Sequence, residues 1–359
     1  MTIRQFIDKY ALALSMAIGV AGYPLFRHLT PVLPPMIGLM LFFTFCKVNP
    51  LDLRLHTWHW LVLGVQIVLT VLTFYGSVWC CNQLGVPEPD NMVISQGLMI
   101  CFIMPTATAA PIIAGKLGGS IQNLTTFTLL SNIATAIIVP AFFPLVHPEG
   151  QMSFMAEMWI ILRRISPLLL LPFVAAWLLR LGYDGWHKRH HSDKRFVLPL
   201  AWAQVPFYLW AGTLVILMGD ITYTLLHDTY RWYTLVVLLI GSLIACLGQY
   251  KLGQTIGYSH PAPSKGKEYK DVVINPAAVP TTMSGVSRIT AGQAFGQKNT
   301  TLGIWMCQAF LNPLSAIGPA AYIIWQNAFN SVQLYKAANY HQPTSADTRM
   351  NQPYMADIE

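Results

Sequence analysis

Long, continuous apolar runs constrain this chain more than any other feature of its sequence. A helix needs about 20 mostly apolar residues to cross a bilayer. Ten candidate stretches follow one another, at 10–28, 31–48, 58–81, 91–117, 119–146, 155–181, 197–225, 230–250, 284–309 and 312–337. Their apolar residues are continuous rather than alternating, which excludes an outer-membrane barrel. Only 10% of the residues are charged, against roughly 25% in soluble domains. The sequence predicts an all-α polytopic membrane protein with ten transmembrane helices.

The basic residues predict how these spans are oriented, because cytoplasmic loops carry an excess of Lys and Arg. With a cytoplasmic N-terminus, sixteen of the 22 basic residues fall inside and two, Arg288 and Lys298, lie in the ninth stretch. The four on the outside are Arg27, Arg163, Arg164 and Arg231. We expect both termini to be cytoplasmic and the protein to lie in a plasma membrane, with a bacterial inner membrane favoured. The charge of +7 sits in short loops beside apolar spans, so we expect no nucleic-acid partner.

The ten stretches divide into five and five at the short segment 147–154, so the second half enters the membrane from the opposite side. This arrangement predicts two inverted five-helix repeats. We expect residues 1–183 to hold the first repeat and the start of the second (spans one to six), and 197–337 to hold spans seven to ten. We expect three polar segments, namely a basic cytoplasmic loop at 184–196, a cytoplasmic insertion at 258–283 and a mobile tail at 338–359. The histidines of the basic loop could bind a metal, but a solvated loop facing anionic lipid is the favoured interpretation.

Two of the stretches carry helix-breaking residues at matching positions of the two halves. In the fourth, Pro105 and Pro111 bracket a Thr-Ala-Thr-Ala-Ala run, and in the ninth, Gly292, Gly296 and Gly303 surround Gln-Lys-Asn-Thr-Thr. Prolines and clustered glycines release backbone groups that lipid cannot satisfy, so such breaks face protein or water. Paired broken helices that meet near the bilayer midplane form the binding site in inverted-repeat transporters. Kinked packing helices are the alternative.

Four segments resemble the bile acid:sodium symporter family. They are Gly38–Arg54, Met104–Gly119, Phe295–Gly303 and Pro313–Tyr335, the last with the family's Pro, Gly-Ala and Trp-x-Asn pattern. The resemblance covers nearly the whole chain in order, apart from the insertion before the ninth stretch. It implies a core domain of spans three to five and eight to ten, with helices four and nine crossing, and a panel domain of spans one, two, six and seven. It also implies transport of organic anions, such as sterol conjugates or small carboxylates, coupled to two sodium ions.

The sodium ligands that the resemblance implies are only partly present. Positions that match are Gln66, Thr128 and Asn299. Positions that differ hold Ala294 in place of a glutamate, Lys298 in place of a glutamine, Ala110 and Pro111 in place of a Ser-Asn pair, and Leu124 in place of a serine, with Asn123 beside it. The position of the family's glutamate thus lacks a carboxylate, and the position of its glutamine carries a positive charge. We therefore do not expect two sodium sites of the usual kind, nor any other cofactor or metal.

Lys298 is the residue on which the functional prediction depends, because a charge inside a membrane segment is costly unless it has a role or a partner. Three interpretations remain open. In the first, the ammonium group replaces a bound sodium by donating to Gln66, Thr128 or nearby carbonyls. In the second, it also exchanges a proton during the cycle, since burial favours its neutral form. In the third, it binds the anionic substrate directly. Snorkelling to the interface is a fourth, structural interpretation.

The sequence thus predicts a secondary active transporter of an organic anion, working by alternating access and independent of sodium. The alternatives are a sodium-coupled symporter with a rebuilt site, and an intramembrane binding or sensor protein that does not transport. We find no ATP, metal or nucleophile–base motif and expect no enzyme. The substrate, the direction of transport and the oligomeric state stay open. The predicted site residues are Lys298, Asn299, Gln297, Thr300, Gln66, Thr106, Thr108, Asn123 and Thr128.

Overall fold

The computed structural model describes residues 3–48, 53–146, 153–189, 196, 198–199, 202, 204–262 and 283–339. Helices make up nearly all of these residues, and the described residues contain no strand beyond one isolated bridge. The predicted all-α class is confirmed. Most of the insertion 258–283 and of the tail 338–359 lies outside the described residues, as do 147–152 and the part of the basic loop at 190–195.

In the first half of the chain, the described residues form seven helices and one 3-10 helix. They are α1 (Ile3–Ala21), α2 (Tyr23–Phe26), η1 (Arg27–Val32), α3 (Leu33–Phe45), α4 (Thr57–Gln83), α5 (Asp90–Ile103), α6 (Ala110–Lys116) and α7 (Ile121–Val146). The first apolar stretch, expected at 10–28, starts earlier and ends at Ala21, because Gly22 and Pro24 open a short new helix there. A proline in the first turn is compatible with a helix, and α3 also begins with one.

The described residues of the second half include six helices and another 3-10 helix. They are α8 (Phe154–Arg189), α10 (Val205–His227), α11 (Trp232–Ser259), α12 (Met283–Gly296), α13 (Thr300–Phe310), η4 (Pro313–Ala316) and α14 (Ile317–Asn339). Helix α8 continues six residues into the segment that we expected to be a loop from 184. The Arg180–Asp184 pair, at 3.9 Å and one turn apart, supports this extension.

Six of the described helical segments are long and apolar enough to cross a membrane by length and composition. They are Tyr23–Phe45, Thr57–Gln83, Ile121–Val146, Phe154–His187, Val205–His227 and Trp232–Ser259. The architecture is therefore that of a multi-pass α-helical membrane protein. Ala11–Ala21 and Asp90–Ile103 are shorter apolar helices, and α14 is 23 residues long but is not among the six. Two of the predicted spans are divided, between α5 and α6 and between α12 and α13.

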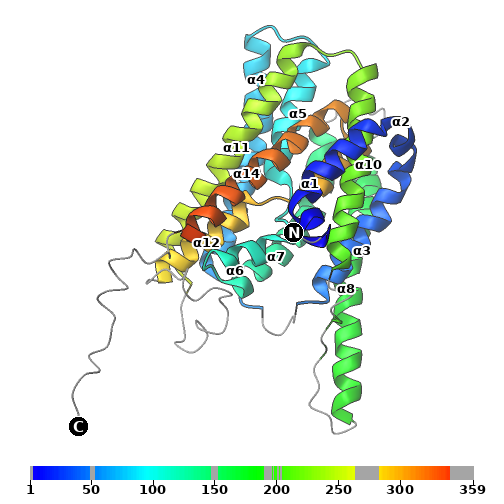
Figure 1. Ribbon diagram of the computed structural model, residues 1–359. Helices are drawn as coiled ribbons and strands as arrows, with labels where there is room; N and C mark the ends of the chain where they lie inside the picture. The colour runs from blue at the N-terminus through cyan, green and yellow to red at the C-terminus, as the bar shows by residue number, and fades with distance from the viewer. Residues whose placement is uncertain are drawn as a thin grey trace, which may run out of the picture.

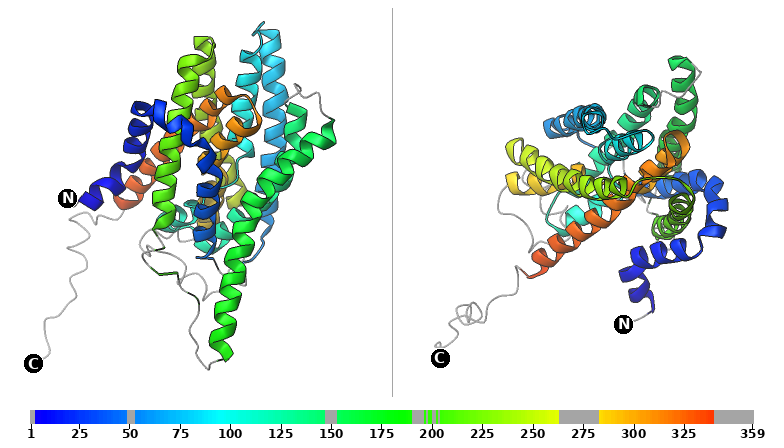
Figure 2. Two further views of the ribbon diagram at one scale, coloured as in Figure 1. Left: turned by 90° about the vertical axis from the view of Figure 1, so that its right-hand side faces the viewer. Right: turned by 90° about the horizontal axis from the view of Figure 1, so that it is seen from above.

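The helices pack in two groups. In one group, α1 and α3 pack on α10, and α3 packs on α8; in the other, α4, α5, α11, α12 and α14 pack on one another. Figure 1 shows α4, α5 and α11 together at one end of the molecule, and Figure 2 (right) places α4 and the N-terminal helices on opposite sides of α14. Helix α7 packs on α8 and on α12, and α13 contacts α10 and α14, so α7 and α13 connect the two groups.

Small residues let α11 and α12 approach closely. A Cβ at Gly253 would lie 2.4 Å from the Ala291 carbonyl oxygen, and a Cβ at Gly257 would lie 2.2 Å from that of Ser287. Small residues at such interfaces are typical of helix pairs in membranes, where packing rather than the hydrophobic effect holds helices together. This contact fixes α12, and with it the second helix break, against the long helix α11.

Candidate functional site: the crossing of two broken helices

The two helix breaks lie against each other. Helix α5 ends at Ile103 and α6 begins at Ala110, while α12 ends at Gly296 and α13 begins at Thr300. Between these ends the chains are extended and pair as an antiparallel bridge at Thr106 and Lys298. The Asn299 N–H donates to the Pro105 carbonyl at 2.8 Å, and the Ala107 N–H donates to the Gln297 carbonyl at 2.9 Å. Each break thus supplies partners for backbone groups that the other leaves outside its helices.

The side chains of the bridged pair repeat this exchange. The Thr106 hydroxyl donates to the Ala294 carbonyl at 2.6 Å, and the Lys298 ammonium donates to the Phe102 carbonyl at 3.2 Å. Each acceptor precedes the bridged residue of its own break by four positions. A shift of 192 residues therefore carries Thr106 onto Lys298 and Phe102 onto Ala294. The two breaks make the same contacts, except that a hydroxyl in one is replaced by a cation in the other.

Lys298 is enclosed within the protein. Its side chain is 1% exposed, its Nζ lies 4.9 Å from the centroid of the Phe295 ring, and its backbone N–H donates to the Gln326 side chain at 3.0 Å. The Phe102 carbonyl belongs to the last turn of α5, where the helix dipole favours a cation. Among the described residues no carboxylate forms an ion pair with it. The lysine does not reach a surface, which argues against snorkelling.

Hydrogen-bond donors occupy the other carbonyls at the end of α5. Gln66, on α4, donates through Nε2 to the carbonyls of Ile103 at 3.4 Å and Met104 at 3.2 Å. Thr135, on α7, donates to the Ile103 carbonyl at 3.4 Å. A carbonyl oxygen that already accepts a hydrogen bond from an ammonium, amide or hydroxyl donor is a weaker ligand for a metal cation. Of the partners that the first interpretation names, a nearby carbonyl accepts from Lys298 in the structure. Gln66 does not accept from the lysine but donates to the same end of α5.

Three predicted site residues from the second break lie beside Lys298 and are buried. The Asn299 side chain accepts from the Leu302 N–H at 3.2 Å through Oδ1 and so caps α13, and its Nδ2 has no partner. The Gln297 Oε1 also lacks a partner, and Thr300 opens the first turn of α13. The break therefore keeps buried polar atoms that the protein itself does not satisfy, which native structures rarely do without a reason.

The predicted site residues of the first half do not all lie at the crossing. Thr106 is at the centre of the crossing, and Thr108 is partly exposed in the same break. Thr128 donates to the Leu124 carbonyl of its own helix at 2.9 Å, and its carbonyl accepts from Ser131 at 3.0 Å. Ser131 in turn accepts from the Thr106 N–H at 3.1 Å. Thr128 thus supports the break through Ser131 and does not bind Lys298 directly.

Asn123 belongs to a different cluster. Its Oδ1 lies 3.1 Å from Nε2 of His56, and its carbonyl lies 3.1 Å from Nε2 of His59, at the start of α4. His59 also accepts from the His56 N–H at 3.0 Å through Nδ1, so the ring caps the start of α4. The structure therefore places Asn123 at the junction between the beginnings of α4 and α7 and not at the crossing.

Sequence reasoning missed the residues that close the second break. The Tyr322 hydroxyl, on α14, donates to the Gly296 carbonyl at 2.7 Å and accepts from Gln249 at 3.2 Å. Gln249 also donates to the Cys101 carbonyl at 3.0 Å. An isolated glutamine in an apolar span is a signal that could have identified Gln249. Tyr322 carries no such signal, because aromatic residues are common throughout these helices.

The crossing can hold charge in a water-poor environment. It combines one buried cation, the N-terminus of the 11-residue helix α13 and unpartnered amide atoms of Gln66, Gln297 and Asn299. Positive helix ends and an ammonium group favour an anion. No family model matches this chain, and a search of curated proteins finds no significant match.

Proposed function

We propose that this chain is a secondary active transporter of an organic anion, with both termini in the cytoplasm of a bacterial cell, and that Lys298 stands where related carriers would hold sodium. The observation that carries the proposal is the Lys298 ammonium, buried to 1% exposure and bound to the Phe102 carbonyl at the crossing of two broken helices. The resemblance to the bile acid:sodium symporter family supplies the substrate class, either a sterol-like anion or a small carboxylate.

The proposal includes ten spans arranged as two inverted repeats. The spacing of the elements supports it, because the shift of 192 residues that relates the two breaks also carries α5 onto α12, α6 onto α13, and α7 onto η4 and α14 within two residues at each end. The two packing groups support the division into a panel with α1, α2, α3, α8 and α10 and a core with α4 to α7 and α11 to α14. Alternating access is then a movement of one group against the other.

Electrostatics favours transport without sodium. A sodium ion about 4 Å from the Lys298 ammonium would be repelled by about 4 kcal/mol at an effective dielectric constant of about 20. Since about 1.4 kcal/mol corresponds to a tenfold change, this repulsion lowers sodium affinity about a thousandfold. The donors on the Phe102, Ile103 and Met104 carbonyls act in the same direction. The fixed charge thus takes over the attraction for an anion that a bound sodium ion provides elsewhere.

The anion itself has partners at the crossing. Asn299 Nδ2 is an unpartnered donor, and the first turn of α13 presents its positive end with Thr300 beside it. An anion that reaches this position neutralises a cation that has no carboxylate partner among the described residues. We therefore place the substrate anion between the N-terminus of α13 and Lys298, with Thr108 at the more exposed edge of the same crossing.

Counterflow in proteoliposomes tests the proposal. Vesicles containing the full chain are loaded with an unlabelled conjugated bile acid or with unlabelled pyruvate, and uptake of the same labelled anion is followed in a potassium buffer without sodium. We expect transient accumulation with at least one of the two probes, and its loss in Lys298→Gln and Asn299→Ala. Saturable binding without exchange would instead identify an intramembrane binding or sensor protein and overturn the transport proposal.

A further inference from the structure

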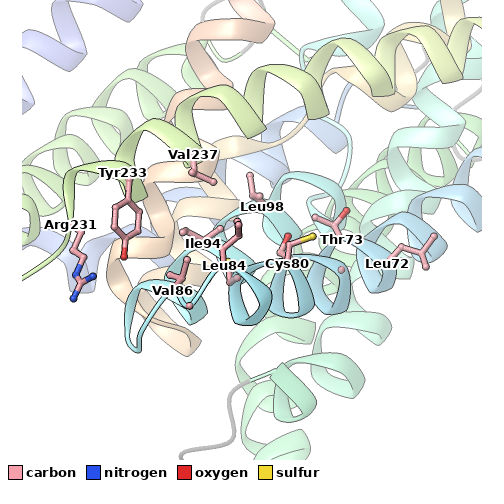
Figure 3. Close-up of a pocket in the computed structure, with 14 residues that line it drawn as sticks. Leu72, Thr73, Cys80, Leu84, Val86, Ile94, Leu98, Arg231, Tyr233 and Val237 are labelled. Carbon is pink, nitrogen blue, oxygen red and sulfur yellow. The ribbon is translucent and has the colours of Figure 1, made fainter.

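A pocket of about 680 Å³ lies away from the crossing, between α4, α5 and α11. Ligand sites typically have volumes of roughly 300–1,000 Å³ and mostly apolar linings with few polar groups. The walls here come from Leu72 and Cys80 on α4 and Val237 on α11, and the floor comes from Ile94 and Leu98 on α5 (Figure 3). The pocket is thus an apolar slot that matches the size of a small ligand or of one hydrocarbon chain.

The pocket opens sideways, toward the region that lipid occupies around a membrane protein. Along its rim Leu72 is 60% exposed and Leu84 is 80% exposed, whereas Ile94 on its floor is 3% exposed. Gly76, in the α4 wall, has open space where a side chain would stand. The exposed rim is thus apolar at these two positions.

One end of the pocket carries an arginine. Figure 3 shows Arg231 and Tyr233 together at this end and Leu72 at the other. The Arg231 guanidinium lies 6.0 Å from the centroid of the Tyr233 ring, and among the described residues no carboxylate pairs with it. The nearby Asp90 carboxylate is engaged, since it accepts from the Arg231 backbone N–H at 3.3 Å and from the Thr234 hydroxyl at 2.6 Å. The guanidinium is therefore available to an anion at the pocket mouth.

We propose that this pocket binds one acyl chain of an anionic membrane phospholipid, whose phosphate group pairs with Arg231. The mouth lies where α4 ends and α11 begins, at the level where a lipid headgroup meets water, and a tyrosine there suits that boundary. The acyl chain gains packing contacts with the apolar walls, and the guanidinium adds a charge-assisted bond to the phosphate. The proposal is independent of what the crossing transports.

Native mass spectrometry of the full chain, delipidated in detergent, tests it with phosphatidylglycerol and with phosphatidylcholine carrying the same acyl chains. We expect one phosphatidylglycerol to bind more tightly than phosphatidylcholine. Arg231→Gln weakens phosphatidylglycerol about tenfold, the equivalent of a lost charged hydrogen bond. It weakens phosphatidylcholine less, because the choline cation of that lipid offsets the charge of the same phosphate group. Gly76→Leu fills the slot and weakens both lipids. Every variant is first checked for a monodisperse elution profile in size-exclusion chromatography. Because the two substitutions remove different contacts, either one tests the proposal if the other fails to fold.

Matched controls distinguish this pocket from general lipid contact. Gly64→Leu adds the same side chain to α4 at another open position outside the pocket, and Arg163→Gln removes an exposed arginine beside Trp159. Both controls should bind phosphatidylglycerol as the unmodified chain does. Bound phosphatidylglycerol should also slow the reaction of N-ethylmaleimide with Cys80, which is exposed in the pocket wall, and inorganic phosphate should not. Equal binding of the two lipids, equal losses in the controls, or protection by phosphate alone would overturn the proposal.

Discussion

Replacing Lys298 by methionine should stabilise the resting protein, although it removes a buried hydrogen bond. The substitution keeps an unbranched side chain of similar length and eliminates a cation that is 1% exposed and has no carboxylate partner among the described residues. Burying a charge costs several kcal/mol even after the protein relaxes. The lost bond to the Phe102 carbonyl costs about 1–3 kcal/mol, and the lost contact with Phe295 costs about 1 kcal/mol.

The difference between these terms is a net stabilisation of about 2 kcal/mol. Because 1 kcal/mol shifts the melting temperature of a large domain by about 2 °C, we expect an increase of about 4 °C. The assay is thermal unfolding of purified protein in detergent, followed by fluorescence-detected size-exclusion chromatography. Such a gain in stability at the expense of activity is common for residues retained for function.

The corresponding position of the other helix break, 192 residues earlier, provides the control. Thr106→Val keeps the shape of the side chain but leaves the Ala294 carbonyl without its hydroxyl donor, in a position with 0% exposure. We expect destabilisation by about 1–3 kcal/mol. The two related positions should therefore respond with opposite signs. If Lys298→Met lowers the melting temperature as much as Thr106→Val does, the lysine is a structural cap and the argument from an unpaired charge is refuted.

Three further predictions concern packing, reactivity and the second helix break. Gly257→Ala should destabilise the chain by about 1–3 kcal/mol, because the new Cβ would lie 2.2 Å from the Ser287 carbonyl oxygen. Gly248→Ala, on the same helix but with open space around it, should leave the stability unchanged. Equal melting temperatures of the two variants would contradict the packing argument. A maleimide should label the folded protein once, at Cys80, and labelling that persists in Cys80→Ser would show that a cysteine described as buried is accessible. Asn299→Ala should remove the cap of α13 and destabilise the protein by about 0.5–2 kcal/mol. Asn299→Asp keeps a side-chain oxygen that can cap the helix. Equal melting temperatures of the two variants would contradict the capping role.

Much of the fold could be predicted because membrane helices have a strong sequence signal. The helix breaks could also be placed, since Pro105 removes a donor and Gly296 weakens the helix at the positions where α5 and α12 end. The end of α8 could not be placed, because its last turns are polar and are held by local contacts such as the one between His187 and the Tyr183 carbonyl. Length and apolarity alone identify where a span lies and not where its helix ends.

The site was predicted less completely, because hydrogen-bond partners depend on helix rotation and register. Lys298, Thr106 and Gln66 were expected near one another, and the structure brings all three to the end of α5. Asn123 was expected there from its place beside Leu124, which stands in place of a serine, but it lies with the histidines at the start of α4. Tyr322 was missed because nothing in its sequence neighbourhood distinguishes it from a packing aromatic. Residue type indicates what a side chain can bind, and only the packing decides what it meets.

The most direct test of the account compares anion uptake with sodium and with potassium as the only external cation. Proteoliposomes with the unmodified chain take up a labelled conjugated bile acid or labelled pyruvate in both buffers, and Lys298→Gln and Lys298→Met are measured beside them. We expect equal initial rates for the unmodified chain in the two buffers and loss of sodium-independent uptake in both variants. Steep dependence of the unmodified chain on external sodium, lost on Lys298→Gln, would contradict the claim that the fixed ammonium group has made sodium unnecessary.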